Sequence, residues 1–203
     1  MKSNPFRQAR YLVSAHRLDQ LPADSGAEVA FAGRSNAGKS SAMNALCDQT
    51  GLARTSKTPG RTQQINVFPL VDPAQRLIDL PGYGYAKVPE ALRAHWRGVL
   101  DAYLRTRTSL RGLVLVMDAR HPLKDFDRQM LVFGAASGRP CHCLLTKADK
   151  LSRSEGARTL AAVRKELAEI APGASAQLFS SLAKTGLDEL RALVIGWLGP
   201  RPD

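Results

Sequence analysis

A glycine-rich segment near the N-terminus has the residue types that bind a phosphate group. Residues 33–40 read GRSNAGKS and fit the pattern G-x-x-x-x-G-K-[ST], between a predicted strand at 28–33 and a predicted helix at 38–47. Glycines allow the backbone N–H groups and the helix N-terminus to face a phosphate closely. Lys39 supplies a positive charge, and Ser40 supplies a hydroxyl for Mg²⁺. The predicted phosphate contacts are Gly33, Arg34, Ser35, Asn36, Ala37, Gly38, Lys39 and Ser40.

A carboxylate and a glycine follow at the distance that such a phosphate site needs. The string DLPG occupies residues 79–82, after a predicted strand at 76–80. An acid at the end of that strand can hold Mg²⁺ through water, and the Gly82 N–H can reach a γ-phosphate because no Cβ blocks it. We therefore predict γ-phosphate contacts at Asp79, Leu80, Pro81 and Gly82.

Two later strings predict recognition of a guanine base. The string TKAD at 146–149 follows a predicted strand at 141–146, and the Asp149 carboxylate can accept hydrogen bonds from guanine N1–H and N2–H₂, a donor pair that adenine lacks. The Lys147 stem can cover the ring. The string FSS at 179–181 follows the last predicted strand and can offer backbone N–H groups to guanine O6. The predicted base contacts are Thr146, Lys147, Ala148, Asp149, Phe179, Ser180 and Ser181.

A polar loop at 55–64 separates the first two strings. In nucleotide switches one threonine of such a loop closes over Mg²⁺ and the γ-phosphate. Thr55, Thr58 and Thr62 are all open to this role from the residues alone. The loop contributes the predicted nucleotide contacts Gly60, Arg61, Thr62, Gln63 and Gln64.

Alternating strands and helices are predicted to position these strings. Further strands are predicted at 64–71, 113–118 and 176–180, and further helices at 89–105, 124–136, 152–170 and 187–198. This alternation predicts an α/β fold with three layers, in which helices cover a mostly parallel sheet and ligands bind where the strands end. With 203 residues, one domain is expected. No apolar run reaches the roughly 18 residues of a membrane-spanning helix.

The strings GRSNAGKS, TPGRTQ, DLPGYGYAKVP, TKAD and SSLAKTG together resemble the EngB-type GTP-binding proteins, within the TrmE–Era–EngA-like translation GTPases. The resemblance extends from about residue 5 to the end. It implies a P-loop NTPase of the Ras-like G-domain type over residues 26–203, with a six-stranded, mostly parallel sheet that has one antiparallel strand, after a basic arm at 1–25. It also selects Thr62 as a metal ligand beside Ser40 and Asp79.

The resemblance also implies a function. It indicates a slow GTPase that binds GTP or GDP with Mg²⁺, resides in the cytoplasm as a monomer, and acts in assembly of the large (50S) ribosomal subunit and in normal cell division and septation. A P-loop nucleotide kinase is a poorer match, because Asp149 reads guanine and no arginine-rich lid is evident. An RNA chaperone whose nucleotide site is regulatory, with negligible turnover, stays open as the alternative.

One expected catalytic group is missing. Ras-like enzymes orient the attacking water with a glutamine after the Asp-x-x-Gly string, and this chain has Tyr83 there. We assign no catalytic residue. Either a K⁺ ion held near Asn36 or the ribosome can supply the missing group, whereas Gln64 begins a predicted strand and is expected to be structural.

The net charge of +11 points to an anionic partner. Three stretches hold this excess, with net charges of +4 at residues 1–18, +3 at 49–71 and +4 at 84–111. The last two adjoin the strings that sense the γ-phosphate, so we predict an RNA-binding surface that nucleotide controls. Its candidate residues are Lys57, Lys87, Arg93, Arg97, Arg105 and Arg107.

The cysteines give no second chemistry. Three thiols suit a reducing compartment. In the string Cys141-His142-Cys143, strand alternation is expected to turn His142 away from both sulfurs, which argues against a metal site.

Overall fold

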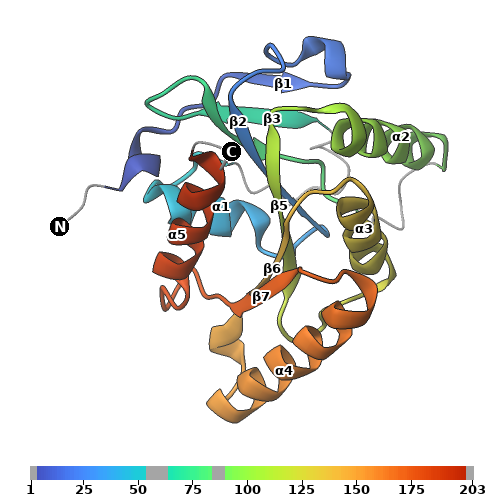
Figure 1. Ribbon diagram of the computed structural model, residues 1–203. Helices are drawn as coiled ribbons and strands as arrows, with labels where there is room; N and C mark the ends of the chain where they lie inside the picture. Colours follow the sequence, from blue (N-terminus) through green and yellow to red (C-terminus); the bar gives the residue numbers. More distant parts are fainter. Residues whose placement is uncertain (1–3, 54–63, 84–89, 200–203) are drawn as a thin grey trace.

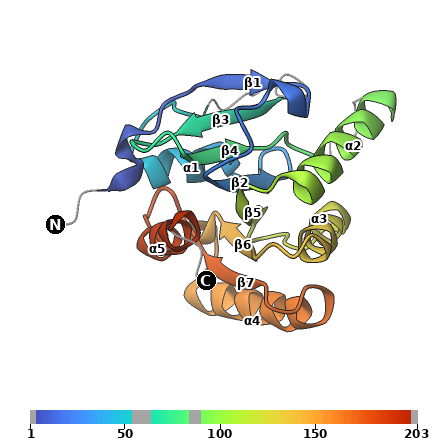
Figure 2. The same cartoon turned by 45° about the horizontal axis from the view of Figure 1, so that its top comes forward.

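In the described residues of the computed structural model, seven strands form one sheet with helices on both faces (Figures 1 and 2). The structure describes residues 4–53, 64–83 and 90–199, with the backbone alone over 90–97. The strands are β1 (Val13–Ala15), β2 (Ala27–Gly33), β3 (Ile65–Pro69), β4 (Gln75–Asp79), β5 (Leu110–Asp118), β6 (Cys141–Thr146) and β7 (Ser175–Leu178). The α-helices are α1 (Lys39–Cys47), α2 (Glu90–Thr106), α3 (Asp125–Ala136), α4 (Arg153–Ile170) and α5 (Leu187–Leu198). Short 3₁₀ turns are η1 (Pro5–Gln8), η2 (Leu18–Gln20) and η3 (Ala148–Lys150).

The sheet order is β1-β3-β4-β2-β5-β6-β7. Both β1 and β4 pair with β3 in antiparallel fashion, and all other pairs are parallel, so β3 alone among the described strands runs against the rest. The predicted mostly parallel sheet with one antiparallel strand is therefore confirmed. The predicted number of six strands is wrong, because the three-residue strand β1, from the stretch expected to be an arm, adds a seventh at the edge.

Two apolar layers bury the sheet on both faces. Alternate residues of β5 point to opposite sides, with Leu113, Leu115 and Met117 on one side and Val114 and Val116 on the other. The first side packs against α2, α3 and α4, and the second against α1, α5 and η1 (Figure 2). Burial on both faces explains why β5 reads as a continuous apolar run.

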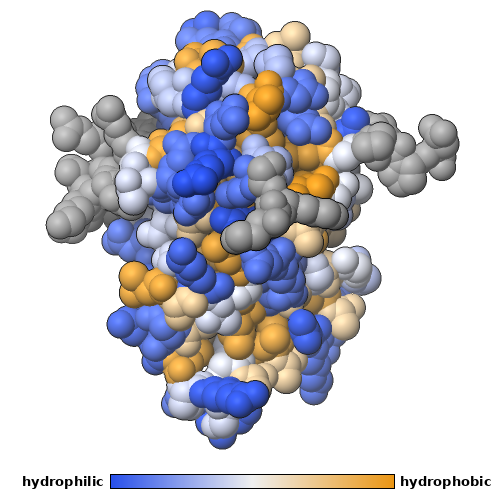
Figure 3. All heavy atoms as spheres, turned by 90° about the vertical axis from the view of Figure 1, so that its left-hand side faces the viewer, coloured by the Kyte–Doolittle hydropathy of each residue, from blue (hydrophilic) through white to orange (hydrophobic). Residues whose placement is uncertain are grey.

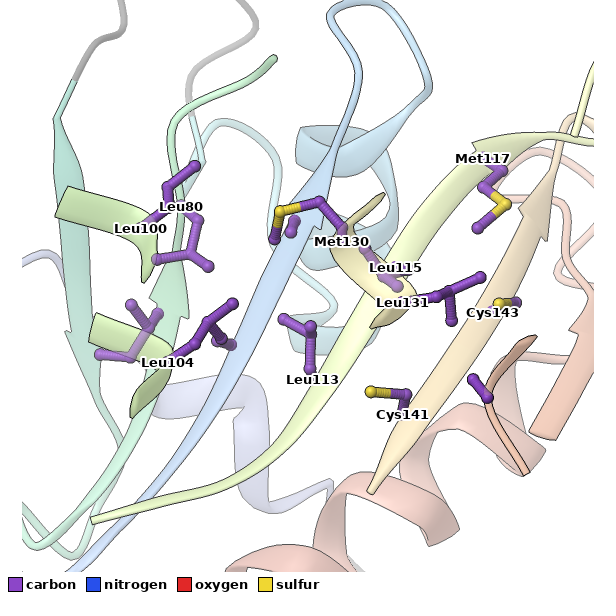
Figure 4. Packing of buried hydrophobic residues seen from close by; sticks show 14 of the residues in the cluster. Leu80, Leu100, Leu104, Leu113, Leu115, Met117, Met130, Leu131, Cys141 and Cys143 are labelled. Atoms are coloured by element: carbon purple, nitrogen blue, oxygen red, sulfur yellow. The ribbon is translucent and has the colours of Figure 1, made fainter. Parts of the chain in front are cut away.

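Figure 4 shows the first layer from close by, where side chains of β5 and β6 meet those of α2 and α3. Leu100 and Leu104 of α2, four residues apart, and the adjacent Met130 and Leu131 of α3 are buried there. On the opposite side of the sheet, the outer surface over η1, α1 and α5 mixes hydrophilic and hydrophobic residues (Figure 3). The helices therefore use one apolar face for the core and present a mixed face outward.

The first residues pack on the domain. Phe6 of η1 is fully buried in the same layer as α1 and α5, and the Asn4 side chain donates a hydrogen bond to Leu46 O at 3.0 Å. Within the described residues, no helix is long and apolar enough to cross a membrane.

Candidate nucleotide-binding site

The phosphate-binding string forms the turn between β2 and α1, as predicted. Gly38 caps α1 with a φ of 95°, and a Cβ at this position would lie 3.2 Å from the Thr146 Oγ1 atom. A Cβ at Gly33 would lie 2.6 Å from the carbonyl oxygen of Val116. Both glycines are needed because each makes a close approach to a neighbouring strand, and Gly38 also adopts left-handed backbone.

The base-reading string is bound to the phosphate loop. The Thr146 hydroxyl lies within hydrogen-bonding distance of the Ala37 carbonyl and 3.0 Å from the Met117 carbonyl. The Lys147 ammonium donates to the Asn36 carbonyl at 2.8 Å. These contacts bring the ends of β2, β5 and β6 to one edge of the sheet, where a parallel fold binds its ligands.

Asp118, at the end of β5, orients the Lys147 side chain. Its carboxylate lies 3.0 Å from the Lys147 ammonium and accepts two hydrogen bonds from the Arg120 guanidinium at 2.7 and 2.9 Å. Arg120 and Lys147 together hold the pKa of Asp118 well below its usual range. The sequence analysis did not assign Asp118 or Arg120, although a carboxylate at the end of a parallel strand is a signal that points to this edge.

Asp149 lies beside Ser180, whose hydroxyl donates to its carboxylate at 2.6 Å. This hydrogen bond lowers the pKa of Asp149 from its ordinary value, so the carboxylate is ionised and able to accept at neutral pH. The structure thus brings the TKAD and FSS strings together. Ala148 N–H reinforces the junction by donating to Phe179 O at 3.1 Å.

The predicted role of the FSS backbone needs a correction at two residues. The Phe179 N–H donates to Leu145 O at 2.8 Å, and the Ser180 N–H donates to Thr185 O at 3.1 Å. Both groups are used to hold the loop and do not face a base. The Ser181 N–H has no acceptor in the described part of the chain, which leaves it as the candidate donor to guanine O6.

Lys39 and Asp79 form an ion pair in the interior of the site. Asp79 is 4% exposed and also accepts a hydrogen bond from the Asn66 side chain at 3.3 Å. Burial lowers the pKa of Lys39 to about 7. Lys39 of α1 is therefore paired with a carboxylate from β4, and Asp79 is held by groups from α1 and β3.

The same residues suit a Mg²⁺ ion. Ser40 follows Lys39 in the first turn of α1, and Asp79 ends β4, so the two elements that Lys39 joins carry a hydroxyl and a carboxylate. Hard oxygen donors of this kind suit Mg²⁺, which would neutralise the phosphate oxygens when bound. Among the described residues, no three His, Cys, Asp or Glu side chains form a cluster that could hold a metal.

Gly82 lies against the phosphate loop. Its neighbour Tyr83 pairs with that loop: Tyr83 N–H donates to Gly33 O at 3.3 Å, and Ser35 N–H donates to Tyr83 O at 3.1 Å. The Tyr83 hydroxyl is turned away, toward α3, and donates to Asp127 at 3.0 Å. The DLPG string thus occupies the expected place beside residues 33–35.

Other predicted contacts fall in the loop between α1 and β3. Gly60, Arg61, Thr62 and Gln63 lie outside the described residues, and so do Thr55 and Thr58. Gln64 is described: it precedes β3, and its side-chain nitrogen lies 2.6 Å from a ring nitrogen of His16. This contact with the β1 region fits the structural role that the sequence predicts for Gln64.

One predicted RNA contact is wrong. Arg107 is 8% exposed, and its guanidinium donates to the fully buried Glu28 at 2.8 and 3.0 Å and to Pro22 O at 2.8 Å. A buried guanidinium paired in this way cannot meet an RNA phosphate. Arg105, by contrast, is exposed and forms only a surface pair with Asp101 at 2.7 Å. The other candidate side chains, those of Lys57, Lys87, Arg93 and Arg97, lie outside the described part.

Strand alternation separates the cysteines from the histidine of β6, as predicted. Cys141 and Cys143 belong to the layer beneath α3 and α4, and the His142 ring lies 2.8 Å from Ser175 Oγ and 3.1 Å from Gln177 Oε1. Burial lowers the pKa of His142 to about 4 and raises that of Cys141 to about 11. These groups are therefore neutral at physiological pH and contribute to the structure.

The fold and the site define the class of a P-loop GTP-binding domain. A family described as 50S ribosome-binding GTPase matches residues 28–147. The chain is 62% identical over 195 residues to the probable GTP-binding protein EngB of Stenotrophomonas maltophilia, covering 96% of this chain and 97% of that one. It is 60% identical to the EngB of Aromatoleum aromaticum, covering 96% and 89% of the two chains.

Solved structures show the same fold at low sequence identity. A crystal structure of a probable GTP-binding protein EngB matches with a TM-score of 0.67 and 21% identity, over 85% of this chain and 98% of that one. Era of Aquifex aeolicus, bound to GDP and aluminium fluoride, matches with a TM-score of 0.65 and 19% identity, over 88% and 58% of the two chains. The chain belongs to the EngB family of GTP-binding proteins, within the 50S ribosome-binding GTPases.

Proposed function

We propose that this protein is a Mg²⁺-dependent molecular switch that hydrolyses GTP slowly and acts in assembly of the large (50S) ribosomal subunit. The observation that carries the proposal is 62% identity to an EngB protein over nearly the whole chain, together with the hydrogen bond that joins Asp149 of the TKAD string to Ser180 of the FSS string. Ser40, Asp79 and Thr62 would hold Mg²⁺. The proposed function includes a requirement for the protein in normal cell division and septation, which the family resemblance implies.

Slow hydrolysis is supported by the side chain after Gly82. The Tyr83 hydroxyl donates to Asp127, and a phenol lacks the amide that orients water in Ras-like enzymes. The missing group comes either from K⁺ held near Asn36, which is exposed in the phosphate loop, or from the ribosomal particle. A K⁺ titration of turnover separates the two, because only the first source is active without particles.

The proposed binding surface for a 50S precursor combines lysine and arginine residues from the segments next to the γ-phosphate. Arg105 at the end of α2 is exposed, and Lys57, Lys87, Arg93 and Arg97 are proposed to join it. Phosphate contacts of this kind weaken steeply as salt rises. The protein is proposed to act as a cytoplasmic monomer whose affinity for the particle is higher with GTP than with GDP.

Co-sedimentation with 50S precursors tests the switch. The protein is spun with particles in the presence of GDP or of a slowly hydrolysed GTP analogue, at two salt concentrations. We expect more protein in the pellet with the analogue, and less when Arg93 and Arg97 are both changed to Glu. Equal pelleting with the two nucleotides would refute the switch, and full binding by the double variant would refute the surface.

The alternative is an RNA or ribosome-binding chaperone with a regulatory nucleotide site and negligible turnover. The Tyr83 side chain favours this alternative, because its hydroxyl donates to Asp127 and it has no amide to orient water. Phosphate release measured with and without 50S precursors distinguishes the two. Stimulation by the particle supports the switch, whereas turnover at background in both conditions supports the chaperone.

A further inference from the structure

A buried carboxylate on α3 joins the phosphate loop to the residue after Gly82. Asp127 lies in the first turn of α3 and is fully buried. Its carboxylate accepts a hydrogen bond from the Tyr83 hydroxyl at 3.0 Å and lies 3.3 Å from the Arg34 Nε atom. It also accepts a hydrogen bond from the Lys124 N–H at 3.0 Å, which ties the carboxylate to the N-terminus of its own helix. Asp127 is therefore a rigid point to which two segments of the nucleotide site are attached.

Backbone hydrogen bonds hold the DLPG segment at the same place. Leu80 N–H donates to Phe31 O at 2.9 Å and Tyr83 N–H donates to Gly33 O at 3.3 Å, so the segment continues the parallel pairing of β4 with β2. Gly82 lies between these two bonds. Its own N–H has no acceptor within the described residues, which leaves this donor available to a γ-phosphate.

The Tyr83 side chain completes this support. Its ring packs beside Phe126 of α3, with 6.2 Å between the ring centroids, and its hydroxyl ends at Asp127. The Arg34 guanidinium lies beside the second oxygen of the Asp127 carboxylate, and its terminal nitrogen donates to His121 O at 3.0 Å. Burial raises the pKa of Asp127, whereas the hydrogen bond from Tyr83 and the nearby positive charge of Arg34 favour its ionised form.

We propose that Asp127 is a positioning residue for γ-phosphate recognition: it anchors Tyr83, and thereby holds the Gly82 N–H where the γ-phosphate of GTP is read. A donor held in place before binding loses little conformational entropy on binding, so the anchor adds affinity for the triphosphate. GDP has no γ-phosphate and gains nothing from it. Tyr83 stands where Ras-like enzymes have a glutamine. It does not orient water and instead supports the adjacent Gly82 N–H. The inference rests on the proposed role of Gly82.

A matched control exists elsewhere in the molecule. The Tyr103 hydroxyl donates to the fully buried Glu28 carboxylate, also at 3.0 Å, near the opposite ends of the strands. Changing either tyrosine to phenylalanine removes one hydroxyl from a buried carboxylate without creating a large cavity. The two variants lose a comparable hydrogen bond, but only one of them lies beside Gly82.

The test measures affinities of the full-length protein for GDP and for a slowly hydrolysed GTP analogue in Mg²⁺. In Tyr83→Phe we expect the affinity for the analogue to fall about three- to tenfold, within the range for one ordinary hydrogen bond, and the affinity for GDP to change less than twofold. Tyr103→Phe should leave the ratio of the two affinities unchanged. Asp127→Asn, which retains an oxygen acceptor for Tyr83, should shift the ratio less than Tyr83→Phe.

Urea unfolding of each variant reports folding separately. An unchanged ratio in a folded Tyr83→Phe variant would overturn the anchor while leaving guanine-nucleotide binding intact, and so would an equal loss for both nucleotides. If the wild-type protein itself binds neither nucleotide, the assignment of the site and the anchor are both wrong.

Discussion

The Lys39 ammonium and the Asp79 carboxylate are in contact inside the nucleotide site. This pair joins the phosphate loop to the end of β4, the two elements that must act on the same phosphate and metal. Phosphate oxygens bound to Lys39 would compete with Asp79 for the ammonium, and Asp79 would then be able to hold Mg²⁺ through water. Binding of phosphate and of metal are therefore expected to be coupled through this pair.

Removing the lysine tests that relationship. In Lys39→Ala we expect the affinity for both GDP and GTP to fall about 10- to 100-fold, because a charge-assisted contact to phosphate is lost. Titration with a fluorescent guanine nucleotide measures the effect. Lys165→Ala, at an exposed position of α4, is the control and should bind as wild type does. Wild-type affinity in Lys39→Ala would contradict the assignment of the phosphate loop.

Asp149→Asn should change the choice of base. We expect GTP affinity to fall about 10- to 100-fold and xanthosine triphosphate to become the preferred ligand, because an amide replaces the carboxylate that accepts from guanine. Competition binding with the two triphosphates measures the shift. Ser180→Ala removes only the hydroxyl that donates to Asp149 and should weaken GTP modestly without a gain for xanthosine. Unchanged GTP affinity in Asp149→Asn would refute the role of Asp149.

Arg105 and Arg107 are two residues apart and should behave in opposite ways. Arg107→Ala leaves the buried Glu28 without one of its partners, and we expect the free energy of unfolding to fall by about 3–5 kcal/mol. Arg105→Ala removes a surface ion pair worth about 0.3–0.5 kcal/mol, so its stability should match wild type, while its binding to 50S precursors weakens. Urea denaturation and co-sedimentation measure the two effects. Wild-type stability in Arg107→Ala would contradict a structural role for Arg107 as the buried partner of Glu28.

The burial of His142 makes a prediction for pH. Its folded-state pKa of about 4 lies below the ordinary value of 6.5, so the unfolded chain takes up a proton first as pH falls. The stabilising contribution is complete above pH 6.5 and is lost between 6.5 and 4. Between pH 7 and pH 5 the wild type should lose about 2 kcal/mol more unfolding free energy than His142→Gln, which cannot titrate. Equal losses in the two proteins would show that His142 is not the group responsible.

The sequence predicted the helices and strands whose apolar spacing follows directly from the face that each of them buries. Alternating and three-and-four apolar spacing located β2, β6, α3 and α5 to within a residue or so, because each element buries one continuous face or run. It failed for β1, since three residues at a sheet edge carry too little periodicity to be recognised. It also misplaced Arg107, since a basic residue at the end of a surface helix has the same local pattern whether it faces water or Glu28.

The order of the motif strings, and hence the class of nucleotide and the parts that bind it, is determined by the sequence alone, because each string carries its chemistry in adjacent residues. Only the tertiary structure decided which distant groups support them. Asp127 lies 44 positions from Tyr83 along the chain, and Lys147 lies 111 positions from the Asn36 carbonyl to which it donates. Contacts of that kind depend on the order of the strands in the sheet and on which side chains are buried against each other. Neither can be inferred from the spacing of residues along the chain.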